Sequence, residues 1–249
     1  MQDSPLHPFE LHSYVHISLW GLDISLNKAV IMMWVVIALA AWFLIAAGRQ
    51  RRLIPTRLQS VAEMLVEFLR DMILDTMGKA GMRFFPFIAS LFIFILFANL
   101  LGLIPGSYTV TSQIVVTAAF ALFVYAMSIV VGFIYHGIRF LHILIPPGTP
   151  PLLLPLMMPI ELISQLARPF ALAVRLFANM TAGHTILAVL FGMALSLPLL
   201  IGWLPFVFTV AISVLEVGIA FIQAYIFTIL TCVYLGDAIN LHGDAQEAH

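Results

Sequence analysis

The chain has 249 residues, of which 62% are hydrophobic and only 9% are charged, and its mean hydropathy is +1.08. A soluble globular domain carries about 25% charged residues, so this composition excludes an ordinary soluble domain and indicates a protein whose solvent is lipid. The net charge of −1 gives no reason to expect a nucleic-acid partner. Cys232 is the only cysteine, so it can form neither an internal disulfide nor an all-cysteine metal site.

Residues 1–20 contain no basic segment followed by an apolar core, so we expect no cleavable signal peptide. The histidines of this segment resemble a metal site only weakly, and a solvated tail is the better interpretation. The uncharged run 29–48 is long enough for a first membrane span. Four arginines follow it: Arg49, Arg51, Arg52 and Arg57. The positive-inside rule therefore places this basic cluster in the cytoplasm and residues 1–28 in the periplasm.

Residues 56–77 have apolar side chains at helical spacing on one side and charged side chains on the other. This pattern predicts an amphipathic helix that lies on the membrane surface. Two further spans are predicted at 84–104 and 110–135, joined by a turn that contains glycine and proline. The proline-rich segment 145–155 then predicts a stiff, apolar re-entry loop.

The last two predicted helices, 156–191 and 203–236, form an antiparallel hairpin and precede a cytoplasmic tail, 237–249. Leu197, Pro198, Gly202 and Pro205 mark the turn. A helix of about 35 residues is roughly 50 Å long, which exceeds the bilayer core of about 30 Å, so these helices must tilt, bend or protrude. The predicted fold is an all-α integral membrane protein with five membrane-embedded helices plus one amphipathic surface helix, in a single membrane domain.

The hairpin also holds the ionisable and amide residues that an apolar helix rarely carries. The first helix carries Glu161, Arg168, Arg175, Asn179 and His184, and the second carries Glu216, Gln223 and Asp237. An ionisable residue at the centre of a membrane helix costs about 2.5–3.5 kcal/mol on insertion scales, so such residues mark functional sites by default. Glu161, Arg168 and Arg175 recur every seven residues, which keeps them on one face.

Folding the hairpin about a midpoint near residue 199 brings polar residues of the two helices to the same levels. His184 comes level with Glu216, Arg175 with Gln223, and Glu161 with Asp237. We interpret this as a proton path that is interrupted at a positive charge. A histidine and a buried carboxyl group suit a proton relay, because both can titrate near neutrality.

Each of these residues also has a structural alternative. Arg175 could form an ion pair with a neighbouring helix, and His184 with Glu216 could form a hydrogen bond that only holds the hairpin together. Asn179 and Gln223 could be interhelical hydrogen-bonding residues. The remaining alternatives are solvated charges for Glu161 and Asp237, a snorkelling side chain for Arg168, and a capping contact for Asn99 instead of a water path.

Three segments resemble subunit a of the F-type ATP synthases, the stator channel subunit. They are ALAVRLFANMTAGH (171–184), EVGIAFIQAYIFTILTCVYL (216–235) and FANLLGLIPG (97–106). With the helix order, the resemblance covers nearly the whole chain. It implies a component of the proton-translocating, membrane-embedded F0 sector that performs no catalytic chemistry alone and binds no cofactor or metal. It also implies a bacterial inner membrane, with the N-terminus periplasmic and the C-terminus cytoplasmic.

The resemblance assigns roles to the polar residues. Arg175 matches the essential arginine that faces the carboxylates of the rotating c-ring, and Gln223 matches the polar residue opposite it. His184 and Glu216 match a pair that lines the outer half-channel, although some bacterial members carry the acid and the histidine in reverse order. Glu161 matches a residue of the cytoplasmic half-channel, to which we also assign Asp237 and Arg168. We place Asn179 and Asn99 beside the outer half-channel.

The partners that the resemblance implies are the c-ring, b-type peripheral-stalk subunits, the rest of the F1F0 ATP synthase and membrane lipid. A secondary transporter without a rotary partner is the first rival, but it predicts repeated halves, and the sequence contains no repeat. A purely structural membrane anchor is the second rival, but it does not need Arg175. Copurification with a c-ring would separate both rivals from the favoured interpretation.

Overall fold

The computed structural model describes residues 13–15, 18–19, 22–23, 26–49, 56–104, 114–144 and 153–240. Its contacts divide the chain into two compact units, each made of three separate segments. Unit 1 contains Met1–Ala46, Ile93–Val116 and Arg175–Ala224. Unit 2 contains Ala47–Phe92, Thr117–Val174 and Tyr225–His249. The sequence-based expectation of a single membrane domain stays a prediction.

Five of the described helices are long and apolar enough to cross a membrane. They are α1 (Lys28–Arg49), α3 (Phe85–Gly102), α4 (Ile114–His136), α5 (Leu154–Ser196) and α6 (Leu199–Ile239). Lipid leaves no water to satisfy backbone groups, so segments of this composition form helices, whose backbone hydrogen bonds are internal. The predicted fold class, an all-α integral membrane protein, is confirmed.

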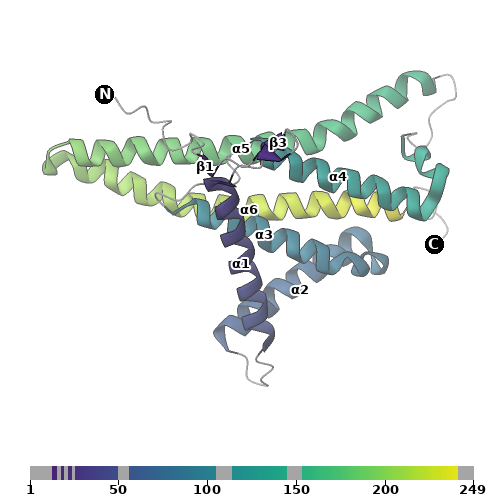
Figure 1. Cartoon of the computed structure of the whole chain (residues 1–249), viewed down its shortest axis with the longest axis horizontal. Helices are drawn as coiled ribbons and strands as arrows, with labels where there is room; N and C mark the ends of the chain where they lie inside the picture. The colour runs from purple at the N-terminus through teal and green to yellow at the C-terminus, as the bar shows by residue number, and fades with distance from the viewer. Residues whose placement is uncertain are drawn as a thin grey trace. The chain divides into compact units, whose positions relative to one another are not determined.

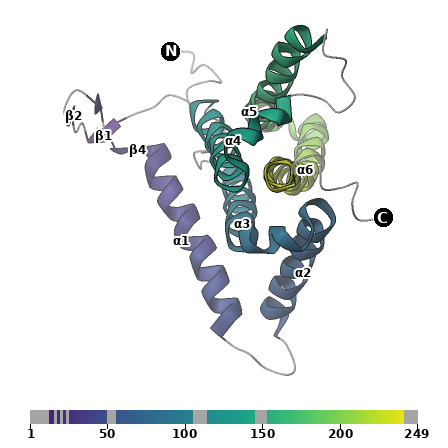
Figure 2. The ribbon, with the colours of Figure 1, turned by 90° about the vertical axis from the view of Figure 1, so that its right-hand side faces the viewer.

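Four short strands precede α1, and the sequence did not lead us to expect them. β1 (Ser13–Val15) pairs with β4 (Leu26–Asn27), and β2 (Ser18–Leu19) pairs with β3 (Leu22–Asp23), both antiparallel. Figure 2 shows this small hairpin region at the amino-terminal end of α1. Strands of two or three residues carry too few alternating positions for a sequence pattern to reveal them.

The amphipathic helix of the prediction is α2 (Arg57–Met77) in unit 2. Thr56 caps it, because its hydroxyl accepts a hydrogen bond from the Gln59 amide at 3.4 Å. Gly78 ends it with a φ of 67°, a left-handed conformation that glycine adopts without strain. The apolar side chains of its last two turns are buried, among them Leu69 and Ile73, whereas its charged face is exposed. A 3-10 helix, η2 (Lys79–Phe84), leads from α2 into α3.

Within unit 2, the carboxyl-terminal end of α6 is held by two other helices. His136, the last residue of α4, donates from Nε2 to the carbonyl oxygen of Ile239 at 2.8 Å. Gly236 lies so close to α2 that an added Cβ would be 3.2 Å from the Thr76 carbonyl oxygen. The hydrogen bond from His136 satisfies a terminal carbonyl of α6, and the missing side chain of Gly236 lets the backbones of α6 and α2 approach each other closely. A second 3-10 helix, η4 (Gly137–Leu144), follows α4.

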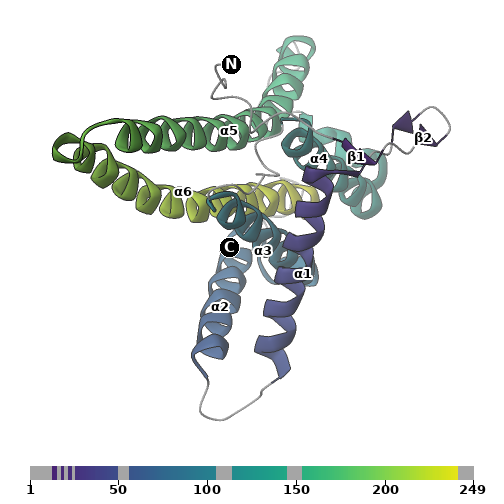
Figure 3. The same ribbon diagram turned by 60° about the vertical axis from the view of Figure 1, so that its left-hand side comes forward.

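Both hairpin helices are longer than predicted. α5 has 43 residues and α6 has 41, so each is about 60 Å long at 1.5 Å per residue. In unit 1 the second half of α5 and the first half of α6 lie side by side up to their connection, as Figures 1 and 3 both show. The turn is shorter than predicted, since Gly202 and Pro205 lie inside α6, which starts at Leu199. Gly202 is needed for packing there, because an added Cβ would lie 2.8 Å from the Ala194 carbonyl oxygen.

Candidate functional site

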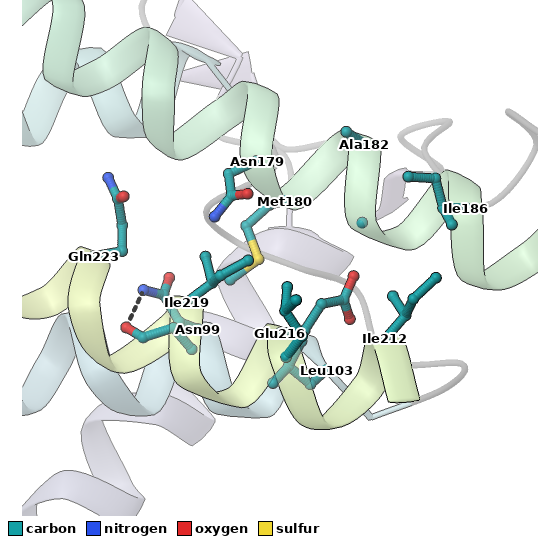
Figure 4. Close-up of a pocket in the computed structure, with 13 residues that line it drawn as sticks. Asn99, Leu103, Asn179, Met180, Ala182, Ile186, Ile212, Glu216, Ile219 and Gln223 are labelled. Carbon is teal, nitrogen blue, oxygen red and sulfur yellow. Dashed lines mark hydrogen bonds between the residues drawn. The ribbon is translucent and has the colours of Figure 1, made fainter. Parts of the chain in front are cut away.

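A cavity of about 150 Å³ lies in unit 1 between α5, α6 and α3. Figure 4 shows its polar side chains pointing inward from all three helices. Asn179 comes from α5, Glu216 and Gln223 from α6, and Asn99 from α3. The rest of the lining is apolar or glycine, including Met180, Gly183, Ile212 and Ile219. Four of the residues selected from the sequence therefore meet around one cavity.

Asn99 is completely buried, and it ties α3 to α6. Its Nδ2 donates a hydrogen bond of 3.3 Å to the carbonyl oxygen of Ala220, one turn from Glu216. Figure 4 shows this bond on the cavity wall. A buried polar side chain that also reaches a neighbouring backbone fixes the separation of the two helices. Asn99 thus makes α3 the third wall of the site.

Glu216 reaches across the cavity to the backbone of α5. Its side chain is 8% exposed, and its Oε1 lies directly against the position that a Cβ on Gly183 would occupy. Only a residue without a side chain leaves this space open. Gly183 and Glu216 are therefore level with each other, close to the register that a fold line near residue 199 predicts. The backbone of His184 follows directly in α5, and its side chain lies outside the described residues.

Several buried polar atoms on the cavity wall have no partner among the described residues. They are Asn99 Oδ1, Glu216 Oε2 and Gln223 Nε2. Gln223 is only 4% exposed, so bulk solvent does not reach it freely. A buried polar atom without a hydrogen bond costs about 1–3 kcal/mol. A cavity of this volume with these polar groups on its wall can hold water molecules that satisfy both donors and acceptors.

Arg175 belongs to the same unit, but it does not line the cavity. Its side chain is exposed, although it lies within an apolar stretch, Ala173–Ser196, that is long enough to cross a membrane. Ala178 and Ala182, three and seven residues further along, are exposed as well, and Ala182 also lines the cavity. No described residue forms an ion pair with Arg175. The charge is thus presented on a face lined by small residues, which permits close approach by another helix.

The residues expected on the cytoplasmic side lie in unit 2. Glu161 is half-buried on α5 and accepts a hydrogen bond of 3.3 Å from Gln165 Nε2, one turn along the helix. Asp237 is half-buried near the end of α6. The side chain of Arg168 lies outside the described residues. The sequence did not direct attention to Gln165, although its position four residues after Glu161 suits an intrahelical hydrogen bond.

Unit 2 has a larger cavity, of about 520 Å³, between α4 and α5. Its lining is apolar except for Tyr125 and includes Ala121, Leu166 and Phe170. It offers no chain of polar groups and so does not suit proton transfer. Within the described parts of the chain, no three His, Cys, Asp or Glu side chains are grouped as metal ligands would be. The cavity of unit 1, with its four polar side chains, and the exposed Arg175 are therefore the candidate site.

Comparison with known proteins shows the family to which the chain belongs. The sequence matches the family model described as "ATP synthase A chain" over residues 30–236. It is 48% identical to "ATP synthase subunit a" of Rhodospirillum rubrum over 239 residues, covering 96% of this chain and 99% of the relative. The protein of the same name from Magnetococcus marinus is 49% identical over 242 residues, with 96% and 93% covered. That from Allorhizobium ampelinum is 49% identical over 249 residues, with 98% and 100% covered. The chain belongs to the ATP synthase A chain family.

Proposed function

We propose that this chain is the stationary proton-conducting subunit of the ATP synthase membrane sector, and that it offers two offset half-channels to a rotating c-ring. The names of its relatives support a role in this complex. The observation that carries the proposal is the exposed Arg175 in an apolar helix, without an ion-pair partner among the described residues. A charge that lies within the hydrocarbon of a membrane is costly unless an opposite charge neutralises it. A carboxylate of a partner subunit is therefore the natural counterion for Arg175.

Arg175 keeps the facing c-ring carboxylate ionised, because an opposite charge at close range favours the charged form. The guanidinium does not lose its own proton in a protein, so it cannot relay protons and it separates the two half-channels. A lysine would be a weaker barrier, since burial can remove its charge. The small exposed residues Ala178 and Ala182 let the partner helix approach this face of α5.

The outer half-channel is the cavity of unit 1. We assign proton transfer to Glu216, with His184 beside it in the chain, and water binding to Asn99, Asn179 and Gln223. The unpartnered atoms of Asn99, Glu216 and Gln223 support this assignment, because a continuous water chain needs both donors and acceptors along its wall. A proton that arrives here neutralises the c-ring carboxylate, which can then rotate into lipid.

The cytoplasmic half-channel lies near Glu161, with Asp237 and Arg168 assigned to the same side. The hydrogen bond from Gln165 orients the Glu161 carboxylate. After nearly a full rotation, the c-ring carboxyl releases its proton here. A membrane potential of 100 mV contributes about 2.3 kcal/mol for each charge that crosses. ATP chemistry belongs to other subunits of the complex, and b-type subunits of the peripheral stalk hold this chain stationary in the bacterial inner membrane.

The orientation of the chain is part of the proposal. Arg49 ends α1, and Arg51, Arg52 and Arg57 follow it in the sequence. These arginines mark the cytoplasmic side, which places residues 1–28 in the periplasm and the carboxyl terminus in the cytoplasm. The connection between α5 and α6 then lies on the periplasmic side. Glu216 is closer in sequence to this connection than Gln223 is, which agrees with an outer path that leads inward along α6.

The decisive test is the Arg175→Ala substitution in the complete complex, with assembly verified first. We expect ATP-driven proton pumping to be lost, whereas passive proton leak through the membrane sector is retained or increased, because the barrier between the half-channels is removed. Arg139→Ala is a suitable control, since Arg139 is exposed and lies in η4, outside both half-channels. Normal coupled pumping by the Arg175→Ala complex would reduce the residue to a structural ion pair and would refute the proposal.

A further inference from the structure

Two hydroxyl residues lie on α6 between the hairpin connection and Glu216. Thr209 donates from Oγ1 to the carbonyl oxygen of Pro205 at 2.9 Å. Ser213 donates from Oγ to the carbonyl oxygen of Thr209 at 2.9 Å. Each hydroxyl has thereby used its single donor, and its oxygen keeps lone pairs that can accept a hydrogen bond from water.

Thr209 occupies the sheltered side of an otherwise exposed stretch of α6. Within the segment 206–211, Thr209 is half-buried and all the remaining residues are exposed, including Phe206 at 54% and Val210 at 50%. Thr209 is seven residues before Glu216 and fourteen before Gln223. At 3.6 residues per turn this spacing keeps all three on one face of the helix. The stripe that lines the cavity therefore extends toward the hairpin connection.

The spacing of the polar groups matches the length of a water bridge. Thr209 and Ser213 are separated by four residues, or about 6 Å along the axis, and Ser213 and Glu216 by three residues, or about 4.5 Å. Neighbouring waters in a hydrogen-bonded chain lie about 2.8 Å apart, so one or two waters fill each of these intervals. A continuous chain of waters can thus run past Thr209 and Ser213 to the carboxylate, while each hydroxyl oxygen accepts one hydrogen bond from it.

We propose that Thr209 and Ser213 extend the outer proton path from Glu216 toward the hairpin connection, where they position the waters that deliver protons. This inference rests on the proposed function. Each water accepts a proton from the water before it and passes one to the next, so the hydroxyl groups gain and lose no proton overall. The last water of the series protonates the Glu216 carboxylate.

A structural interpretation predicts different behaviour. Hydroxyls that bond back to the carbonyl four residues earlier bend a helix slightly, and Pro205 removes one backbone donor nearby. A bend needs no water at Thr209. Ser196, at the end of α5, makes the same kind of bond to the Gly192 carbonyl oxygen at 2.8 Å and is exposed. It provides a matched control for loss of a back-bonded hydroxyl.

Cysteine accessibility separates the two interpretations, because a thiol reacts as the thiolate, which forms in water and not in lipid. We would substitute Thr209→Cys, Ser213→Cys and, as a control, the exposed neighbour Val210→Cys in the complete complex. Vesicles of known orientation would be treated from each side with a small cationic methanethiosulfonate. We expect positions 209 and 213 to react at least tenfold faster than position 210, from the periplasmic side, and proton conduction to fall in proportion. Equal, slow reaction at all three positions would overturn the proposal.

Proton conduction by isosteric variants provides a second test. Thr209→Val removes the hydroxyl but keeps the shape, so we expect conduction to fall several-fold, whereas Thr209→Ser and the control Ser196→Ala retain it. Glu216→Gln in the same assay tests the proposed function itself. If Thr209→Val conducts protons fully while Glu216→Gln does not conduct, the role of the hydroxyl groups is overturned and the role of Glu216 stands. Full conduction by both variants would overturn the whole outer path.

Discussion

The close approach of Glu216 to Gly183 leads to a specific prediction for Gly183→Ala. The added methyl group would collide with the Glu216 carboxylate, whose Oε1 already occupies the position of the new Cβ. The carboxyl carbon lies 3.0 Å from that position, whereas ordinary contacts begin at 3.4 Å and extend to 4 Å. The carboxylate oxygen must therefore move by more than about 1 Å, or the two helices must separate. Because the colliding atom is the free end of a flexible side chain, the carboxylate can swing aside at little cost in stability.

The displacement should affect proton conduction more than assembly. A misplacement of about 1 Å in a reacting group can reduce a rate by about 100-fold, so we expect passive proton conduction to fall between tenfold and 100-fold. The assay is proton flux through the membrane sector in vesicles, normalised to the amount of assembled complex. Gly192→Ala is the matched control: it lies on the same helix, and an added Cβ there meets nothing within 4 Å.

A second substitution tests whether the collision is the cause. Glu216→Asp shortens the side chain by one carbon, a retreat of about 1.5 Å. In the Gly183→Ala background this change should restore part of the lost conduction, because it removes the contact. An unchanged rate in the single Gly183→Ala variant, or no recovery in the double variant, would refute the geometric argument.

Three further predictions follow from the packing of the same chain. Asn99→Ala removes the buried hydrogen bond to Ala220 and should lower stability by about 0.6–1.7 kcal/mol, measured as a lower thermal midpoint of the assembled complex. An unchanged midpoint would show that this bond does not stabilise the structure. Gly202→Ala places a Cβ 2.8 Å from the Ala194 carbonyl oxygen, so we expect a loss of about 1–3 kcal/mol of stability, measured by the same thermal midpoint. Wild-type stability of this variant would show that the hairpin connection can relax. Cys232 is completely buried, so maleimide should not modify it in the folded complex until denaturant is added, as mass spectrometry can establish. Rapid labelling without denaturant would show that this part of α6 opens.

The membrane helices were predictable because long apolar runs leave few alternatives, and the amphipathic pattern of α2 was equally clear. The ends of the hairpin helices were not predictable to the residue. Gly202 and Pro205 suggested a wider turn, but both lie inside α6, where the proline falls in the second turn and disturbs few backbone bonds. The sequence contained no signal for the short strands before α1.

The candidate site could be predicted in part from spacing. Glu216 and Gln223, seven residues apart, line one cavity in the structure, and so does Asn99 from a distant helix. The close contact between Glu216 and Gly183 could not be predicted, because it depends on how closely two helices approach each other. The sheltered position of Thr209 likewise depends on which face of α6 packs inward. The roles of Arg175, His184, Glu161, Asp237 and Arg168 stay predictions.

The exposed guanidinium of Arg175 also has a consequence for biogenesis. A newly inserted copy that has not met its partner holds this charge in hydrocarbon without a counterion, at a cost of about 2.5–3.5 kcal/mol. Since each 1.4 kcal/mol corresponds to a factor of ten, the orphan hairpin is biased roughly 100-fold toward leaving the bilayer, compared with an uncharged one. This unpaired charge would thus distinguish orphan copies from assembled ones, and a quality-control protease could recognise them by it.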